Sequence, residues 1–107
     1  MPERHWIEEL PQHAGETVSV RGWVATTRSS GKIAFVVIRD GTGYLQAVIS
    51  KRDVESGVWD SFEKLTQETT VEVTGTVRTE PRAPGGVELQ TSDLKIIGSS
   101  TDFPITP

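Results

Sequence analysis

Apolar and polar residues alternate along two runs near the middle of the chain, residues 33–39 (IAFVVIR) and 44–50 (YLQAVIS). The four residues between them are Asp40-Gly41-Thr42-Gly43, and a short glycine-containing link between two such runs predicts a β-hairpin. Aspartate and glycine suit the tight and positive-φ positions of such a turn. The register that follows pairs Arg39 with Tyr44, Val37 with Gln46, and Phe35 with Val48.

This register gives the hairpin two different faces, because successive side chains of a strand point to opposite sides. One face is wholly apolar and is predicted to lie in the core: Ala34, Val36, Ile38, Leu45, Ala47 and Ile49. The other face carries two aromatic rings, a cation and an amide among small aliphatic side chains: Phe35, Val37, Arg39, Tyr44, Gln46 and Val48. Such a face suits the stacking and reading of a nucleic-acid base. The alternative is that another element covers its two rings and makes a second small core.

Three further stretches alternate in hydropathy and predict strands, at residues 17–27, 69–78 and 87–97. Gly22 stands in the middle of the first of them, where a glycine indicates a bulge or a sharp bend of a small barrel. A proline- and glycine-rich loop at residues 80–86 separates the last two.

Two helices are predicted as well. Apolar residues at helical spacing predict an amphipathic helix over residues 53–67. A shorter helix is predicted at residues 5–10, where Pro11 limits it. The residues that indicate the longer helix are Val54, Val58, Trp59, Phe62 and Leu65.

The order strand, strand, strand, helix, strand, strand predicts an all-β fold of the OB type. It is a five-stranded Greek-key barrel with one helix between strands three and four and a short N-terminal helix. An SH3-like barrel is the alternative, which the intervening helix disfavours. We expect residues 1–98 to form the domain, and residues 99–107, which are polar and lack a period, to begin a linker.

Composition narrows the possible functions. A chain of 107 residues is one domain, too small for a typical enzyme with separate substrate sites, and no catalytic residue is predicted. It has no cysteine, no apolar run long enough for a membrane span and no signal peptide, so we expect a cytoplasmic protein. His5 and His13 are eight residues apart with no third ligand in a suitable pattern, so no metal site is expected.

Charge is segregated along the chain. The formal net charge is −4, yet residues 21–52 hold six cations against one acid and carry +5, so the remainder carries −9. Salt-dependent contact with phosphate is therefore expected on the hairpin surface, although strand-edge cations also prevent edge aggregation. The expected phosphate or rim contacts are Lys32, Arg39, Tyr44 and Arg82.

Four segments carry a resemblance to a known family: RSSGKIAFVVIRDGTGYLQAVI, TQETTVEVTGTVR, RAPGGVELQ and the terminal DFPITP. On these segments the chain resembles the N-terminal anticodon-binding domain of class IIb aminoacyl-tRNA synthetases, and most of all the bacterial asparaginyl enzymes. The resemblance covers essentially the whole chain, and the first segment is highly specific. In the family the last segment leads into a catalytic domain, which these residues do not contain.

The resemblance implies that the hairpin face receives unstacked anticodon bases. Phe35 matches the family's stacking phenylalanine, Gln46 its reader of the central uridine, and Arg28 an arginine near the same base. Glu88 matches a glutamate associated with the first anticodon base, although it could also be a solvated strand residue. Aspartyl enzymes often carry a further arginine where this chain has Thr26, which favours the asparaginyl enzymes.

The implied function is recognition of the tRNA anticodon for a ligase that charges tRNA with asparagine. By the same resemblance, ATP and Mg²⁺ belong to the missing catalytic domain, and these residues hold no cofactor and no activity of their own. The full-length enzyme would be a homodimer and the isolated domain a monomer. The alternatives are the same domain of an aspartyl enzyme, a free-standing OB-fold that binds single-stranded nucleic acid or a protein, or an engineered scaffold.

Overall fold

The structure is a computed structural model that describes residues 3–65, 69–83 and 86–98. The predicted linker at residues 99–107 lies outside this description. Strands and helices follow one another as β1 (Glu3–Arg4), η1 (Ile7–His13), β2 (Thr17–Ser30), β3 (Ile33–Arg39), β4 (Tyr44–Ser50), α1 (Ser56–Glu63), β5 (Thr70–Thr79) and β6 (Val87–Gly98).

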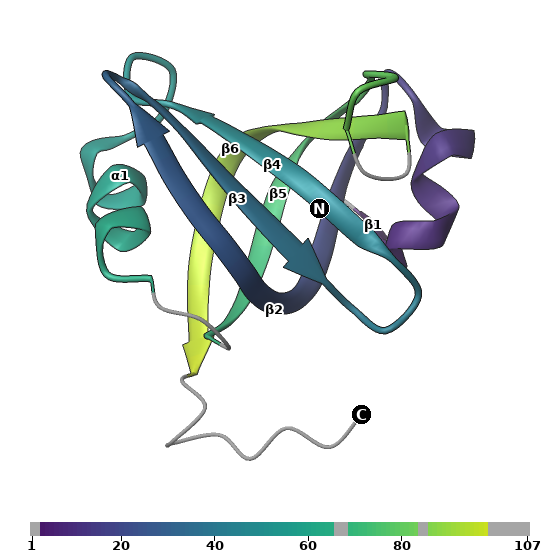
Figure 1. Cartoon of the computed structure of the whole chain (residues 1–107), viewed down its shortest axis with the longest axis horizontal. Coiled ribbons are helices and arrows are strands. Elements are labelled where there is room, and N and C mark those ends of the chain that lie inside the picture. The colour runs from purple at the N-terminus through teal and green to yellow at the C-terminus, as the bar shows by residue number, and fades with distance from the viewer. Residues whose placement is uncertain (1–2, 66–68, 84–85, 99–107) are drawn as a thin grey trace.

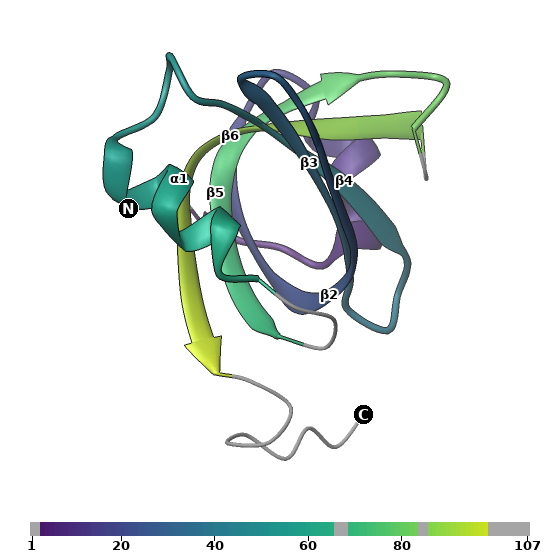
Figure 2. The same cartoon turned by 60° about the vertical axis from the view of Figure 1, so that its left-hand side comes forward.

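Strand pairing closes a ring in the order β2–β3–β4–β6–β5 and back to β2 (Figures 1 and 2). The β4–β6 pair is parallel, and the other pairs of the ring are antiparallel. The two-residue strand β1, which the sequence did not predict, adds to β2 in parallel. The five ring strands and the helix between the third and fourth of them confirm the predicted OB-type architecture.

β2 closes the ring because it pairs with two different strands. Its first half, from Thr17 to Trp23, pairs with β5, and its second half, from Trp23 to Ser30, pairs with β3. Gly22 lies at the corner, where an added Cβ would be 2.4 Å from the Arg39 carbonyl oxygen. Gly22 therefore marks a close approach of two backbones. The register shift itself lies between Val24 and Thr26, two to four residues beyond Gly22, where the bulge or bend was predicted.

The predicted hairpin register is confirmed. Arg39 pairs with Tyr44, and the pairs continue along β3 and β4 without a shift. All six residues of the predicted core face have 0% of their surface exposed. The inward valines of β2 and β5 complete the core, together with Leu10 from η1 and Leu89 from β6.

The two helices lie at opposite ends of the ring (Figure 1). α1 is shorter than the predicted helix over residues 53–67, because a turn at Asp53 precedes it and i to i+3 hydrogen bonds at Lys64 and Leu65 end it. Residue 67 lies outside the described residues. η1 is a 3₁₀ helix that contains Pro11, so the expectation that Pro11 limits the helix was wrong. The φ that proline fixes falls within the 3₁₀ range.

The turn between β3 and β4 holds η1 in place. Asp40 is buried, and its Oδ2 accepts a hydrogen bond of 2.7 Å from the Ile7 backbone N–H. Its Oδ1 accepts from the backbone N–H and the hydroxyl of Thr42, and Thr42 Oγ1 in turn accepts from the Glu8 backbone N–H. Ile7 and Leu10 are thereby buried against the ring, whereas Trp6 is exposed.

Gly22→Ala should lower the free energy of unfolding by about 1–3 kcal/mol, because the new methyl group must push the β3 backbone or Ile38 away. Gly57→Ala in α1 is the matched control. Nothing lies within 4 Å of a Cβ there, and alanine favours a helix by up to about 1 kcal/mol over glycine. Urea unfolding of both variants measures the two effects, and an undiminished stability of Gly22→Ala would contradict the close approach.

Candidate nucleic-acid interface

The outward side chains of β3 and β4 fall into three rows that run across the sheet. The first row contains Arg28, Phe35, Val48 and Gln90; the second contains Thr26, Val37, Gln46, Glu88 and Arg78; the third contains Trp23, Arg39 and Tyr44. Neighbouring rows are two residues apart along β3 and β4, or about 7 Å. Within residues 3–65, 69–83 and 86–98 no second core covers the two rings, since Phe35 is half-buried and Tyr44 is 53% exposed.

In the first row Arg28 covers the ring of Phe35. The guanidinium carbon lies 4.3 Å from the ring centroid, and the two residues are direct partners across β2 and β3. Arg28 is exposed, so this is a surface cation–π contact, worth about 0.5–1 kcal/mol. The predicted stacking ring and the arginine predicted to lie near the central uridine therefore touch each other.

The second row holds an ion pair that continues into an amide. Glu88 is 5% exposed and accepts a short hydrogen bond from Arg78 Nη2 through Oε1. Its Oε2 accepts from Gln46 Nε2 at 3.4 Å. Because a carboxylate only accepts, the nitrogen of the Gln46 amide must face Glu88. The reading of Glu88 as a solvated strand residue was wrong, since β5 and β6 place it against Arg78.

The third row forms one end of the surface. The Arg39 guanidinium carbon lies 5.2 Å from the centroid of the Trp23 ring, and Arg39 is the cross-strand partner of Tyr44. Lys32 lies in the β2–β3 turn at the opposite end of the hairpin, and Arg82 lies in the loop before β6; both are exposed. Two of the predicted rim residues, Arg39 and Tyr44, thus belong to the third row, and the other two lie in turns between strands of the ring.

Arg21 does not contribute to this surface, although it belongs to the basic stretch. Its Nε lies 2.7 Å from Glu72 Oε2 on β5, in the half of β2 that pairs away from β3. Arg78 is the residue that sequence reasoning missed. Its only local signal was the end of an alternating strand, and its role depends on the register that places it opposite Glu88.

Comparison with known proteins gives a consistent result. Residues 18–97 match the tRNA anticodon family model, described as an OB-fold nucleic acid binding domain. The chain is 47% identical over 100 residues to the asparagine–tRNA ligase of Symbiobacterium thermophilum, a match that covers 94% of this chain and 23% of that protein.

Two solved structures are similar to the chain as well. An asparaginyl-tRNA synthetase from Pyrococcus horikoshii, complexed with asparaginyl-adenylate, matches with a TM-score of 0.84 and 38% identity over 99% of this chain and 25% of that one. A structure assigned to an aspartyl-tRNA synthetase from Leishmania major matches with a TM-score of 0.80 and 29% identity over 98% of this chain and 22% of that one.

The chain spans about a quarter of the length of these relatives. The resemblance found in the sequence is confirmed, and so is the OB-fold over the SH3-like alternative. No helix among residues 3–65, 69–83 and 86–98 is long and apolar enough to cross a membrane.

Arg78→Leu should lower the free energy of unfolding by about 1–3 kcal/mol, because the Glu88 side chain, which is only 7% exposed, would lose its cation. Arg21→Leu is the matched control. The Arg21 side chain is 54% exposed, so loss of its pair with Glu72 should cost less than about 1 kcal/mol. Denaturant unfolding measures both variants, and equal losses would contradict the burial of the Glu88 charge.

Proposed function

Because the chain belongs to the OB-fold nucleic-acid-binding domains of the tRNA anticodon family, we propose that it recognises the anticodon loop of a tRNA for an asparagine–tRNA ligase. One observation carries the proposal: the outward face of β3 and β4 places a stackable ring beside an amide whose orientation Glu88 fixes. Residues 1–98 would be the binding module and residues 99–107 the start of a linker.

Asparagine is favoured over aspartate as the amino acid of the ligase. The asparagine enzymes compared above are 47% and 38% identical to the chain, against 29% for the aspartyl enzyme. Thr26 stands in the same row as Gln46 and Glu88, with Val37 between Thr26 and Gln46, so an arginine at this position would add a cation to the row of the amide. Its absence is consistent with an asparaginyl enzyme.

Binding of a base would exchange one contact of Phe35 for another. Stacking of a base on an aromatic ring is worth about 1–3 kcal/mol, more than the surface cation–π contact that Arg28 makes with the same ring. A base can therefore displace Arg28. The displaced guanidinium remains next to the bound base, where it donates hydrogen bonds to base carbonyls or to phosphate.

Glu88 would hold the Gln46 amide in the orientation that pairs with uridine. The Gln46 amide can accept from uridine N3–H and donate to a uridine carbonyl, but after half a turn it would suit cytidine equally well. With its nitrogen held by Glu88, that half-turn places the amide oxygen against a carboxylate, which is unfavourable. The Glu88 carboxylate, although paired with Arg78 and Gln46, retains lone pairs that can accept a hydrogen bond from a guanine edge. This suits the contact with the first anticodon base that the resemblance implies for Glu88.

The remaining properties follow from the family. The ligase would act in the cytoplasm as a homodimer, and ATP and Mg²⁺ would bind in a catalytic domain outside these 107 residues. The isolated module would be a monomer without catalytic activity, because one small barrel is too small to supply both an ATP site and an amino-acid pocket. Asparagine-dependent exchange of pyrophosphate into ATP by the purified 107-residue chain would contradict this.

Phe35→Ala should weaken binding of an anticodon stem-loop by about 1–3 kcal/mol, because the stacking surface is lost. The fold should persist, since the side chain points away from the core. Phe35→Tyr keeps the ring and should bind within about threefold of the unchanged chain. Fluorescence anisotropy measures binding, and circular dichroism checks the fold. If Phe35→Ala binds as tightly as the unchanged chain, this ring is not the stacking platform.

Arg28→Gln should narrow the preference for uridine over cytidine at the central anticodon position by about 1–3 kcal/mol, the value of one good base contact. The reason is that a guanidinium only donates, so it suits a uridine carbonyl and opposes the cytidine amino group. Lys32→Gln is the control and should weaken both RNAs alike, as expected of a phosphate contact. Titration of the two stem-loops separates these cases; an equal loss on both from Arg28→Gln would make Arg28 a phosphate contact only.

A further inference from the structure

The only two histidines of the chain come together beside η1, on elements that the anticodon proposal does not use. The ring centroids of His5 and His13 are 4.1 Å apart, with an angle of 38° between the ring planes. Glu9 joins them, and one potential ligand atom from each of the three residues lies within 4.8 Å of the others. The expectation that the two histidines lack a third ligand was therefore wrong.

The backbone at Trp6 explains why this cluster forms. Trp6 is extended, with φ −77° and ψ 150°, and the His5 backbone N–H is bound to the Ser19 carbonyl of β2. The chain thus turns at Trp6, and His5 lies alongside the helix instead of continuing its axis. The sequence signal was the even spacing of His5, Glu9 and His13, four residues apart each time.

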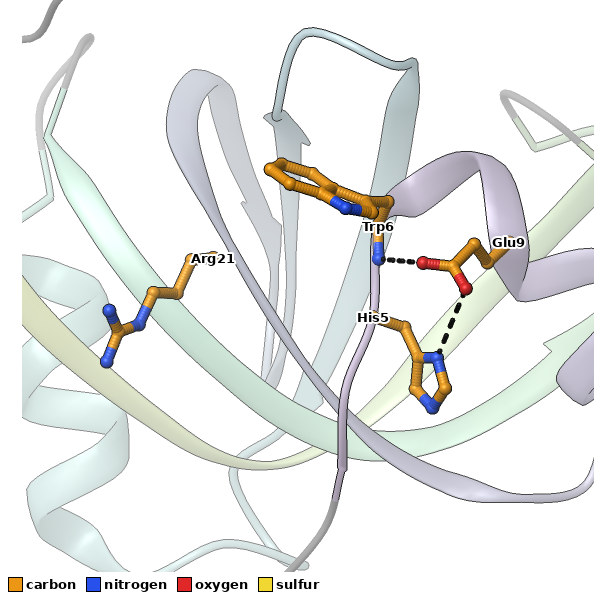
Figure 3. Close-up of a pocket in the computed structure, with 4 residues that line it drawn as sticks. All are labelled: His5, Trp6, Glu9 and Arg21. Atoms are coloured by element: carbon orange, nitrogen blue, oxygen red, sulfur yellow. Dashed lines mark hydrogen bonds and ion pairs between the residues drawn. The ribbon is translucent and has the colours of Figure 1, made fainter.

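His5 and Glu9 face each other (Figure 3), and the distance between their potential ligand atoms is close to that of two ligands on one metal ion. His5 Nδ1 lies 3.7 Å from Glu9 Oε2, which is too long for a hydrogen bond. Two ligand atoms on one tetrahedral zinc, each about 2.1 Å from the metal, are about 3.4 Å apart. An ion between these two atoms therefore needs only a small adjustment of the side chains.

Glu9 is held in the required position. Its Oε1 accepts a hydrogen bond of 2.9 Å from the Trp6 backbone N–H, which directs Oε2 toward His5 (Figure 3). The same backbone hydrogen bond favours the carboxylate form and so lowers the pKa of Glu9 below its ordinary value. An ionised, oriented carboxylate is the form in which glutamate binds metal.

Glu16 orients the imidazole ring of His13. His13 Nδ1 lies 3.2 Å from Glu16 Oε2, and because a carboxylate only accepts, Nδ1 carries the hydrogen. His13 Nε2 then carries the lone pair. Metal-binding histidines ordinarily donate their second N–H to a carboxylate or carbonyl in this manner. Arg21 lines the same pocket, but its side chain points away from His5 and Glu9 (Figure 3) and its Nε pairs with Glu72 on β5.

We propose that His5, Glu9 and His13 bind one divalent transition-metal ion, with Zn²⁺ as the best match. Two imidazoles and one carboxylate form a set that zinc accepts, with water in the fourth position, whereas Mg²⁺ and Ca²⁺ prefer oxygen ligands alone. The side chains of His5, His13 and Glu9 are 11%, 24% and 41% exposed, so an ion can enter from solvent. The bound ion would tie the start of η1 to its end and hold the helix against the β3–β4 turn.

The chain makes this proposal easy to test, because it has no cysteine and only two histidines. On tag-free protein, calorimetric titration with Zn²⁺ should show one equivalent of saturable binding. The imidazole resonances of both histidines should shift together in NMR spectra, and Co²⁺ should give the visible absorption of a tetrahedral site. Zn²⁺ should also raise the melting temperature, since it binds the folded state.

Glu9→Gln should weaken Zn²⁺ binding at least about tenfold, because loss of a ligand costs no less than loss of an outer-shell partner. Glu8→Gln is the matched control: this neighbouring acid is exposed, lies outside the cluster, and should bind within about twofold of the unchanged chain. The proposal is overturned by the absence of saturable binding below about 1 mM, by a shift of one imidazole alone, or by equal affinities of the two variants. Circular dichroism confirms that both variants are folded.

Discussion

The double pairing of β2 is the constraint on which the rest of the structure depends. β2 is one continuous strand of 14 residues that pairs with β5 along its first half and with β3 along its second half. Where the two halves meet, at Gly22, its backbone lies very close to that of β3. Gly22 permits this contact, and Gly75 permits a similar one between β5 and the Gln90 carbonyl. At both corners the absence of a Cβ lets two backbones lie close together in the closed ring, in which β6 pairs with both β4 and β5.

Closure of the ring is also what completes the proposed binding surface. Gln46 is on β4 and Glu88 is on β6, so their contact exists only because these strands pair in parallel. Arg78 reaches Glu88 from the other side, across the β5–β6 pair. The orientation of one amide in the candidate site therefore depends on three strands that are distant in sequence, and a change that loosens β6 would affect specificity as well as stability.

The alternation of apolar and polar residues was sufficient to predict the hairpin of β3 and β4. It was not sufficient to predict the partner of Glu88 or the histidine cluster. The period of two along β3 and β4, with a four-residue turn, fixes register and core face together, because a shift by one residue would expose Ala34, Val36 and Ile38. The partner of Glu88 depends on the β5–β6 register, which shifts between Thr74 and Gly75 and cannot be read from alternation alone. The histidine cluster was missed because it requires the turn at Trp6, which no periodic pattern indicates.

The placement of positive charge fits the proposed recognition of an RNA loop by a chain of net charge −4. Three cations of the basic stretch lie over aromatic rings: Arg28 over Phe35, Arg39 over Trp23 and Lys51 over Trp59. The contacts of Arg28 and Arg39 hold flexible side chains on the proposed binding surface and reduce the entropy that binding must remove, whereas Trp59 is buried in the core. Duplexes offer no free base face to displace Arg28, so they gain only phosphate contacts, which the acidic remainder of the chain opposes. An unstacked loop would gain both base stacking on Phe35 and phosphate contacts. This difference would favour binding of single-stranded over double-stranded RNA.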